Sequence, residues 1–459
     1  MAALTMAPPT SPDAVTDTAP PRSMSMFQLN SMMLGIIGIQ FAWSMQIALS
    51  SPVLEPLGAN PQILGLIWMA GPVTGMLVQP LVGAWSDACR SVLGRRRPFI
   101  IAGAILAALS LAIFPLSPNL LFAAAMIWVI DACVNMSQVP YRALIPDCVP
   151  QHQNQLANSI MNAAFGVGSV IALGTAPLLG LMGVEMSVFQ QFLMASVAMI
   201  LTIGYSSMVI KEPRLPAVVA TPDDKPPSLL DGLKALLKAS PEVYKLCAVQ
   251  FFTWIGIMCM FMYLTQFMIH SIYQLPDFST EAGKLALAAN PAWEALQSQA
   301  VTMTQVSLVA FNLTSLLLAV PLGMLANRIG RKRVHSIALL LMAAAFATAP
   351  LLTQGWHVVA MLGVAGVAWA TVLSIPFSLL FDYSPKGKEG VLIGAFNLFV
   401  ASPQLLSASV VGYLISQQPV ITQFGATHNW ALAFVVGSIS VLIAACVLQL
   451  FNERKTSLA

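Results

Sequence analysis

Four polar side chains line up inside one long hydrophobic run of the sequence. They are Asp131, Asn135, Gln138 and Arg142, spaced i, i+4, i+7 and i+11. At about 100° per residue, this spacing places all four on one face of an α-helix. A carboxylate and a guanidinium are costly at membrane depth, so a stripe of this kind indicates a functional site. We expect the stripe to bind a polar solute and a proton.

The composition of the chain places this stripe in a membrane protein. Of the 459 residues, 57% are hydrophobic and only 8% are charged, and the mean hydropathy is +0.78. Apolar runs of about 18 residues or more recur along the whole chain, and each is long enough to cross a bilayer as a helix. The formal net charge of +3 is small, and the basic residues lie in short loops. We therefore expect lipid and a small solute as partners, and no nucleic acid.

The apolar runs predict an all-α membrane protein with twelve transmembrane helices. The expected spans are 29–50, 62–84, 98–117, 119–144, 156–180, 188–210, 244–270, 299–325, 334–352, 356–380, 390–415 and 429–451. An even number of spans puts both termini on the same side of the membrane.

The spans divide the chain into two six-helix halves. We expect a disordered tail at 1–26, halves at 27–210 and 244–451, a linker at 211–243 and a short tail at 452–459. Residues 229–238 alternate apolar and basic positions at helical spacing, which predicts a short amphipathic helix on the inner leaflet. The connection at 271–298 is long enough for a small helix of its own.

Lysine and arginine residues predict the orientation. With both termini in the cytoplasm, all but two of the 21 Lys and Arg residues lie in inner connections or at inner helix ends. The two exceptions are Arg142, inside a span, and Lys284, outside. The reverse orientation would put nearly all of them outside. We expect a multi-pass protein of an inner or plasma membrane with cytoplasmic termini.

The two halves carry an internal repeat. The run Gly94-Arg95-Arg96-Arg97 after span two corresponds to Gly330-Arg331-Lys332-Arg333 after span eight, at an offset of 236 residues. Pro140 and Pro376 have the same offset. Parallel repeats of this kind place a substrate site at the interface between the halves. The same offset maps Asp131 to Val367 and Arg142 to Ser378, so the two membrane charges belong to the first half only.

The arginine-rich loops resemble the signature of the major facilitator superfamily. Asp87 precedes Arg95, Arg96 and Arg97, and Arg331 and Arg333 occupy the corresponding loop of the second half. Carboxylate–arginine pairs across helix ends would latch one conformation and release it in the other, so we expect these six residues to act in gating. The alternative is that the basic residues only anchor the inner side of the membrane.

The segment Gly71–Ile100 is similar to a narrower group, the plant-type sucrose–proton symporters and their bacterial and animal relatives, related to the glycoside–pentoside–hexuronide cation symporters. The long interval from Asp87 to Gly94 and the ending Arg-Arg-Arg-Pro-Phe99 are particular to that group. The family's order of Asp, Asn, Gln, Pro and Arg is met by Asp131, Asn135, Gln138, Pro140 and Arg142. The similarity is dense over 30–180 and thin afterwards.

This resemblance implies proton-coupled import of sucrose, maltose or a related glucoside, with Asp131 as the protonation site and no cofactor besides the proton. Asp131 lies about 18 Å into a helix that starts outside, near the middle of the bilayer. Burial disfavours a charged carboxyl, so Asp131 would take up a proton outside and release it inside. The alternative is a structural carboxyl bonded to a neighbouring helix. Ser51–Asn60 lacks the histidine of plant members, and Thr302–Asn312 lacks their further charges.

Sugar recognition needs hydrogen-bonding side chains and an aromatic surface for the apolar face of the ring. The candidates beyond the stripe are Gln40, Trp43, Gln46, Asn158, Asn162, Gln250 and Trp254, with Asn312, Trp369, Asn397 and Gln404 as further ones. The alternative for each is a hydrogen bond between helices or an interfacial aromatic. Arg142 either donates to the solute or extends its guanidinium to the cytoplasmic surface.

Other function classes lack their motifs. No Gly-x4-Gly-Lys-Ser/Thr sequence occurs, which argues against ATP-driven transport. We find no nucleophile–base arrangement, so we expect no enzyme, and the six cysteines have no metal-ligand spacing. A sodium-coupled or uncoupled carrier, an exporter of the same fold and a non-transporting sugar sensor stay open as alternatives. We expect the protein to function as a monomer.

Overall fold

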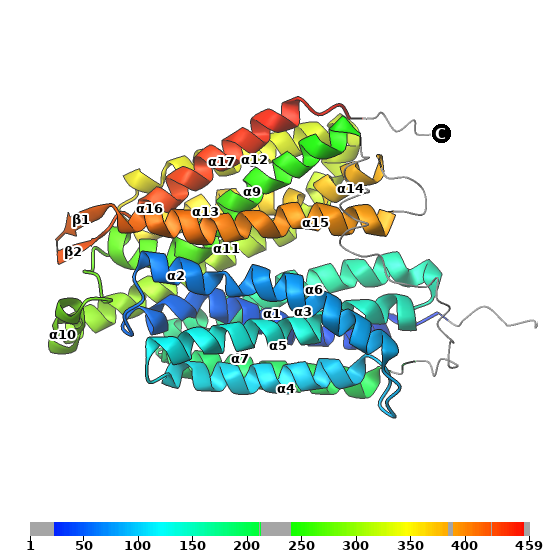
Figure 1. Cartoon of the computed structure of the whole chain (residues 1–459), viewed down its shortest axis with the longest axis horizontal. Helices are drawn as coiled ribbons and strands as arrows, with labels where there is room; N and C mark the ends of the chain where they lie inside the picture. The colour runs from blue at the N-terminus through cyan, green and yellow to red at the C-terminus, as the bar shows by residue number, and fades with distance from the viewer. Residues whose placement is uncertain (1–22, 211, 213–239, 384–388, 424, 454–459) are drawn as a thin grey trace, which may run out of the picture.

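Long helices run side by side from one end of the molecule to the other (Figure 1). The computed structural model describes residues 23–210, 212, 240–383, 389–423 and 425–453. Within these residues, twelve helical segments are long and apolar enough to cross a membrane. The expected amphipathic helix at 229–238 and residues 1–22 of the expected tail lie outside the described residues.

The first six-helix half contains all the helices up to residue 209. They are α1 (Met26–Leu54), α2 (Pro61–Trp68), α3 (Ala70–Ala88), α4 (Arg97–Ile113), α5 (Leu120–Cys148), α6 (Asn154–Leu181) and α7 (Val188–Val209), with short 3₁₀ turns at Phe114–Leu116 and Gln151–Gln153. Polar caps set several of the starts. Asn119 accepts a hydrogen bond from Phe122 N at the start of α5, and Ser187 forms a capping box with Gln190 at the start of α7.

The second half repeats this arrangement. Its elements are α9 (Pro241–Gln266), η3 (Phe267–Ile272), α10 (Glu281–Ala289), α11 (Pro291–Ile329), α12 (Arg331–Ala347), η4 (Ala349–Leu351), α13 (Gly355–Val372), α14 (Ile375–Phe381), α15 (Glu389–Leu406), η5 (Ser407–Val411), α16 (Gly412–Ser416) and α17 (Ala431–Gln449). The helix α10 confirms the small helix expected within 271–298.

Two spans that hydropathy presents as single helices are interrupted. The second span breaks after Trp68, and the tenth breaks after Val372. Pro72 and Pro376 each lie four residues further on, so neither can donate the backbone hydrogen bond that would continue the helix through these positions. The turns η3 and η5 are π-helical, which widens the helices that begin as α9 and α15.

A short β-hairpin departs from the expected all-α fold. Strands β1 (Pro419–Thr422) and β2 (Gly425–His428) pair antiparallel in the stretch between the expected spans 390–415 and 429–451. The β-branched residues Val420, Ile421 and Thr422 favour this extended conformation. We call the end of the molecule with this hairpin the hairpin end, and the opposite end, with Arg95–Arg97 and Arg331–Arg333, the basic end.

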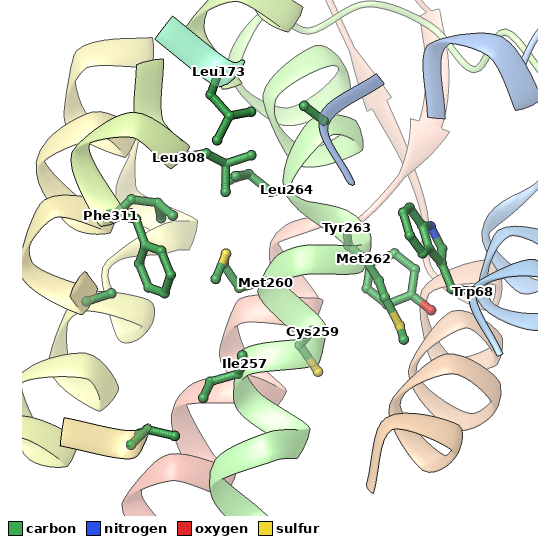
Figure 2. Close-up of a cluster of buried hydrophobic side chains, with 14 of the residues drawn as sticks. Trp68, Leu173, Ile257, Cys259, Met260, Met262, Tyr263, Leu264, Leu308 and Phe311 are labelled. Atoms are coloured by element: carbon green, nitrogen blue, oxygen red, sulfur yellow. The ribbon is translucent and has the colours of Figure 1, made fainter. Parts of the chain in front are cut away.

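The two halves meet where α6 packs on α11 and where α2 packs on η5 and α16, with a smaller contact between α1 and α9. Within the halves, α1 packs on α6 and α7, and α9 packs on α15 and α17. Figure 2 shows a buried cluster with members from both halves, in which Trp68 and Leu173 of the first half lie near Tyr263 and Leu308 of the second. This apolar contact holds the molecule together around the polar residues described next.

Candidate functional site

Asp131 is a buried carboxylate with one side-chain partner. It lies on α5 and is 1% exposed. Gln46 Nε2 on α1 donates to its Oδ1 at 2.7 Å. A Cβ on Gly71 of α3 would lie 3.7 Å from Oδ2, so the helix backbone closes that side of the carboxyl. Among the described residues, no basic side chain lies within ion-pair distance of Asp131.

Asn135, one turn along α5, connects the stripe to α3. Its Oδ1 accepts from Gln79 Nε2 at 2.8 Å. Its Nδ2 donates to Thr74 Oγ1 at 3.3 Å and to the carbonyl of Asp131 at 2.9 Å. Three helices therefore converge on the first two members of the stripe: α1 through Gln46, α3 through Thr74 and Gln79, and α5.

Arg142 occupies a different environment at the basic end of the same helix. Its side chain is exposed, and its guanidinium carbon lies 5.5 Å from the centre of the Phe165 ring on α6. Such an arrangement is a cation–π contact. Asn158 and Asn162, also exposed, precede Phe165 at helical spacing on the same face of α6. The stripe thus runs from a buried carboxylate to an arginine that solvent reaches.

In the second half, α9 carries buried polar atoms that lack partners. Gln250 is fully buried, and neither its Oε1 nor its Nε2 has a hydrogen-bond partner among the described residues. The same is true of Thr253 Oγ1 and Trp254 Nε1. Unpaired buried polar atoms are costly, so an arrangement of this kind indicates a place for a hydrogen-bonding ligand or water.

An aromatic cluster includes Trp254, one helical turn after Gln250 on α9. The Trp254 ring lies 5.8 Å from Trp369 of α13 in an edge-to-face arrangement. Trp369 also contacts Phe261 of α9 and Phe311 of α11 at centroid distances of 5.8 and 5.7 Å. The second half therefore offers aromatic surface, whereas the first half offers the carboxylate and amides.

The remaining sequence candidates have less distinctive environments. Gln40 Nε2 donates to Ser169 Oγ of α6 at 2.8 Å, and Trp43 and Gln138 are half-buried. Asn312 and Gln404 each donate to a carbonyl of their own helix. The side chain of Asn397 lies outside the described residues. The binding roles of all these residues stay predictions.

Sequence reasoning did not select Gly71, Thr74 and Gln79 of α3. Gln79 is an amide inside an apolar span, which is the same signal that selected Gln46. Its pairing with Asn135 depends on the rotation of α3 against α5, and a sequence alone does not give that rotation.

The halves are joined by hydrogen bonds toward the hairpin end. Thr265 Oγ1 donates to the carbonyl of Ala48 at 3.1 Å, and Gln305 of α11 donates to Gln191 of α7. Glu55 accepts from Gln266 and from the backbone of Phe278 at 2.7 and 2.8 Å. Between described residues, we find no hydrogen bond that joins the halves near the basic end. The structure is therefore closed between the halves at the hairpin end.

A glycine contact makes this closure testable. A Cβ on Gly65 of α2 would lie 1.8 Å from the carbonyl oxygen of Ala408 in η5, closer than atoms can approach. We expect Gly65→Ala to hold the hairpin end apart and to lengthen the distance between spin labels at Glu185 and Gln417, both exposed there. Gly204→Ala is the matched control, because nothing lies within 4 Å of that position. An unchanged distance in Gly65→Ala would contradict the closed arrangement.

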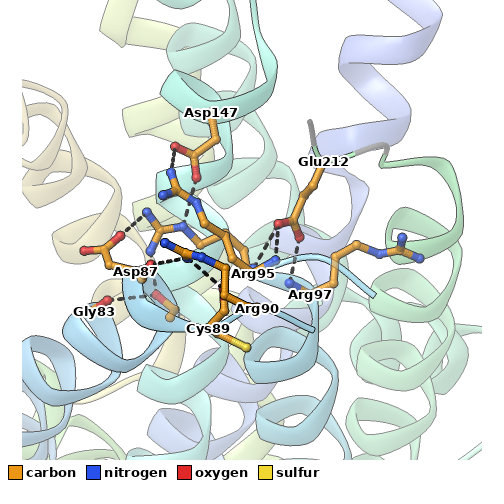
Figure 3. A network of polar contacts seen from close by, with 10 residues as sticks. Gly83, Asp87, Cys89, Arg90, Arg95, Arg97, Asp147 and Glu212 are labelled. Atoms are coloured by element: carbon orange, nitrogen blue, oxygen red, sulfur yellow. Dashed lines mark hydrogen bonds and ion pairs between the residues drawn. The ribbon is translucent and has the colours of Figure 1, made fainter. Parts of the chain in front are cut away.

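A network of charges holds the basic end of the first half together (Figure 3). Arg96 pairs with Asp87 and with Asp147, its Nε lying 2.9 Å from Asp147 Oδ2, and Arg95 also pairs with Asp147. Glu212, just after α7, accepts from the backbone N–H groups of Arg95, Arg96 and Arg97 at 2.7, 3.0 and 2.8 Å. A carboxylate at a helix start is favourable, because unpaired N–H groups point at it.

The second half repeats this network. Arg331 pairs with Asp382 and with Glu453, the latter at 3.1 Å, and Glu453 also accepts from the backbone of Arg331 and Lys332. Gly94 and Gly330, which precede the two arginine runs, both have positive φ, at 110° and 101°. The two halves therefore build the same structure, which we call the clasp. The clasp of the first half consists of Arg95, Asp147 and Glu212. The clasp of the second half consists of Arg331, Asp382 and Glu453.

Not all of the six residues expected to act in gating form the carboxylate–arginine pairs of the clasps. Asp87 pairs with Arg96, but the side chains of Arg97 and Arg333 form no ion pair with another described residue. Glu212 and Glu453 were not selected because they lie outside the helices, where no helical spacing marks them. Each clasp lies inside one half, so the gating role of Asp87, Arg95, Arg96, Arg97, Arg331 and Arg333 stays a prediction.

Comparison with known proteins places the chain among transporters. It matches the family description Major Facilitator Superfamily over residues 32–292 and 278–458. The General alpha-glucoside permease of Schizosaccharomyces pombe is 25% identical over an alignment of 513 positions, gaps included, which covers 92% of this chain and 93% of that protein. Sucrose transport protein SUT4 of Oryza sativa is 34% identical over an alignment of 191 positions, gaps included, which covers 36% of this chain and 32% of that protein. The aligned region thus spans about a third of the plant protein.

Solved structures agree on the fold. A crystal structure of the nucleoside transporter NupG matches with a TM-score of 0.64 over 94% of this chain and 99% of that one, at 14% identity. A peptide transporter POT in complex with sulfate also matches with a TM-score of 0.64, over 93% of this chain and 95% of that one, at 13% identity. These relatives are named as transporters or permeases, in agreement with the expectation that this chain is not an enzyme.

Proposed function

Because this chain belongs to the Major Facilitator Superfamily, we propose that it imports a sugar together with a proton by alternating access. The sugar we propose is sucrose, maltose or a related α-glucoside. An α-glucoside permease related along nearly the whole chain and plant sucrose transport proteins related over a third of it support this substrate class. The proposed membrane is an inner or plasma membrane, with the basic end in the cytoplasm.

One observation supports proton coupling above the others. Asp131 is a buried carboxylate that has an amide partner but no cation beside it among the described residues. A carboxylate without a counter-charge is costly in a low-dielectric interior, whereas the protonated acid is not. Binding a proton at Asp131 would therefore let the loaded carrier change from the outward-facing to the inward-facing state. Loss of the proton to the cytoplasm would then allow the empty carrier to return.

The two halves would divide the recognition of the sugar. Amides and the guanidinium of α5 and α6 suit hydroxyl groups, and the cluster around Trp254 and Trp369 suits the apolar face of a sugar ring. In the present conformation the hairpin end is closed and Arg142 is exposed near the basic end. We assign this conformation to the inward-facing state, from which the sugar leaves for the cytoplasm.

Uptake into proteoliposomes tests the proposal. A panel of labelled glucosides is offered with a pH gradient, with a sodium gradient and with neither, and accumulation driven only by the pH gradient is the expected result. Flux driven by sodium or by the sugar gradient alone would favour the two coupling alternatives. Binding without flux would indicate a sensor, and outward-directed accumulation an exporter.

Gln250 allows recognition to be separated from stability. We expect Gln250→Met to weaken sugar affinity about fivefold, because a hydrogen bond to a buried amide is worth about 1 kcal/mol. The same change should leave thermal stability equal or higher, because the amide has no partner among the described residues of the ligand-free protein. Equilibrium binding and thermal unfolding measure the two effects.

Gln449→Met is the matched control for this change. Gln449 donates to Ser336 Oγ at 2.9 Å near the basic end, away from the aromatic cluster. The Gln449→Met protein should be less stable than the unsubstituted protein and should bind sugar with the same affinity. Unchanged affinity in Gln250→Met would remove Gln250 from the binding site.

A further inference from the structure

Glu55 is a carboxylate of the first half that is buried among donors of the second. It follows directly after α1 and is 1% exposed. Gln266 Nε2 donates to Oε2 at 2.7 Å, and the backbone N–H of Phe278 donates to Oε1 at 2.8 Å. His270 Nε2 lies 2.8 Å from Oε1. Among the described residues, this is the ion-pair contact that joins the two halves.

The tautomer of His270 follows from its other contact. His270 Nδ1 lies 2.9 Å from the carbonyl oxygen of Leu275, which can only accept, so Nδ1 carries a hydrogen. The indole of Trp430 stacks on the ring, with centroids 5.7 Å apart and planes at 21°, and fixes its orientation. Nε2 is therefore held 2.8 Å from Glu55 Oε1, at ion-pair distance but without the alignment of a hydrogen bond.

The contact between Glu55 and His270 is favourable when the pair holds one proton. With no proton on Nε2 or on the carboxyl, two acceptors face each other and repel. With two protons, the carboxyl gains an O–H, but its oxygens already face donors from Gln266, Phe278 and His270, so the new donor has no acceptor. With one proton, held on Nε2, an imidazolium and a carboxylate lie at ion-pair distance and attract each other.

We propose that Glu55 and His270 form a proton-counting latch at the hairpin end, which closes the outer side of the carrier only when the pair holds one proton. The proposal rests on the alternating-access part of the proposed function, but on neither the sugar nor Asp131. When the halves separate, both groups meet water. A free carboxyl then loses its proton near pH 4.3 and a free imidazole near pH 6.5.

The sign of the pH effect follows from this proton count. Between about pH 4.3 and 6.5 the separated pair already holds one proton, so closing neither takes up nor releases any. Above about pH 6.5 closing takes up one proton, so the ratio of closed to open molecules falls about tenfold per pH unit. Below about pH 4.3 closing releases one proton, and the ratio falls again with decreasing pH.

The neighbouring titratable groups do not produce this profile. Asp277, in the loop after η3, pairs with His428 of β2 at 3.3 Å. Burial acts to raise the pKa of the Asp277 carboxyl, but hydrogen bonds from His428 and Ser279 outweigh it and lower the pKa to about 2. Asp277 therefore stays ionised above about pH 4. His428 is one-fifth exposed and is removed by substitution in the test.

A cavity brings external water close to the latch. It has a volume of about 470 Å³, and its walls include His270, Gln274, Thr422 and His428. It lies at the hairpin end, between η3 and the β-hairpin. The cavity therefore borders His270 on the side of the β-hairpin.

The test measures the closed fraction without sugar and without a gradient. Spin labels at Glu185 and Gln417, on the two halves at the hairpin end, report the distance in the full chain in lipid nanodiscs between pH 4 and 8.5. We expect a closed fraction that is greatest near pH 5 to 6 and falls on both sides. His270→Gln keeps a donor but does not titrate, so it should lose the alkaline fall. Glu55→Gln should lose the acidic fall.

Two further variants locate the effect. His428→Gln should keep the two-sided profile, and so should Glu281→Gln, whose carboxylate is 85% exposed on α10. The proposal is overturned by a flat profile in the unsubstituted protein, by an alkaline fall that persists in His270→Gln, or by an acidic fall that persists in Glu55→Gln. If His270→Gln does not fold, the Glu55→Gln variant decides the question: the proposal stands if this variant loses the acidic fall and is overturned if it keeps it.

Discussion

Asp131→Asn is expected to abolish concentrative uptake of sugar while sugar exchange continues. A carrier coupled to one proton can accumulate its solute about tenfold per pH unit of gradient, because one pH unit is worth about 1.4 kcal/mol. The amide cannot release a proton, so the accumulation ratio should fall to about one. Asparagine keeps an oxygen that can accept from Gln46 Nε2, so the packing of α1 on α5 should survive.

The measurement compares net uptake with counterflow in the same proteoliposomes. Counterflow needs only the exchange of loaded carriers and should persist in Asp131→Asn. Glu281→Gln provides the control, because that carboxylate is 85% exposed on α10 and pairs only with nearby Lys284 among the described residues. Undiminished uphill uptake by Asp131→Asn would place proton coupling elsewhere.

Arg96→Met is expected to cause the largest loss of stability of any single change in the charge networks at the basic end. The Arg96 side chain is 8% exposed, and it pairs with Asp147, which is 13% exposed, and with Asp87. Removing one member of a buried ion pair leaves an uncompensated charge and costs about 3 kcal/mol or more. Unfolding in detergent micelles, followed by circular dichroism, measures this loss.

Two comparisons check the reason for this loss. Arg333→Met removes an exposed arginine that has no ion pair with another described residue, so it should change stability by less than about 0.5 kcal/mol. Adding Asp147→Asn to Arg96→Met removes the stranded charge and should recover part of the loss. Additive losses in the double variant would show that Arg96 and Asp147 act independently.

Much of the fold follows from the sequence because hydropathy and length decide which segments cross a membrane. The expected span 119–144 corresponds to the observed membrane segment Leu120–Ile145, and 188–210 to Val188–Val209. The interruptions after Trp68 and Val372 were not expected, although Pro72 and Pro376 are their cause. A proline within an apolar run is compatible with a kink or a break, and the surrounding packing decides which one forms.

The candidate site was accessible to sequence reasoning only within a single helix. Helical spacing correctly puts Asp131, Asn135 and Arg142 on one continuous helix, because that periodicity is local. Partners on other helices, such as Gln79 for Asn135 or Phe165 for Arg142, depend on helix rotation and tilt. The Glu55–His270 contact depends in addition on which side of the carrier is closed.

The internal repeat predicted that the two halves have equivalent arginines at the basic end. The offset of 236 residues equates Arg95 with Arg331, and both pair with a carboxylate at the end of the fourth or tenth span. The same offset equates Pro140 with Pro376, which precede these two carboxylates on their spans. Neither glutamate of the clasps was found, because Glu212 and Glu453 act on backbone N–H groups, which leave no mark in a sequence.

The position of those glutamates has a consequence for biosynthesis. Glu212 comes directly after α7, so the clasp of the first half has all its members once residue 212 has been translated. That half can settle in the bilayer while the ribosome is still making α9. The clasp of the second half depends on Glu453, which follows α17. The backbone N–H groups at Arg331 therefore lack this acceptor until the final span has been made.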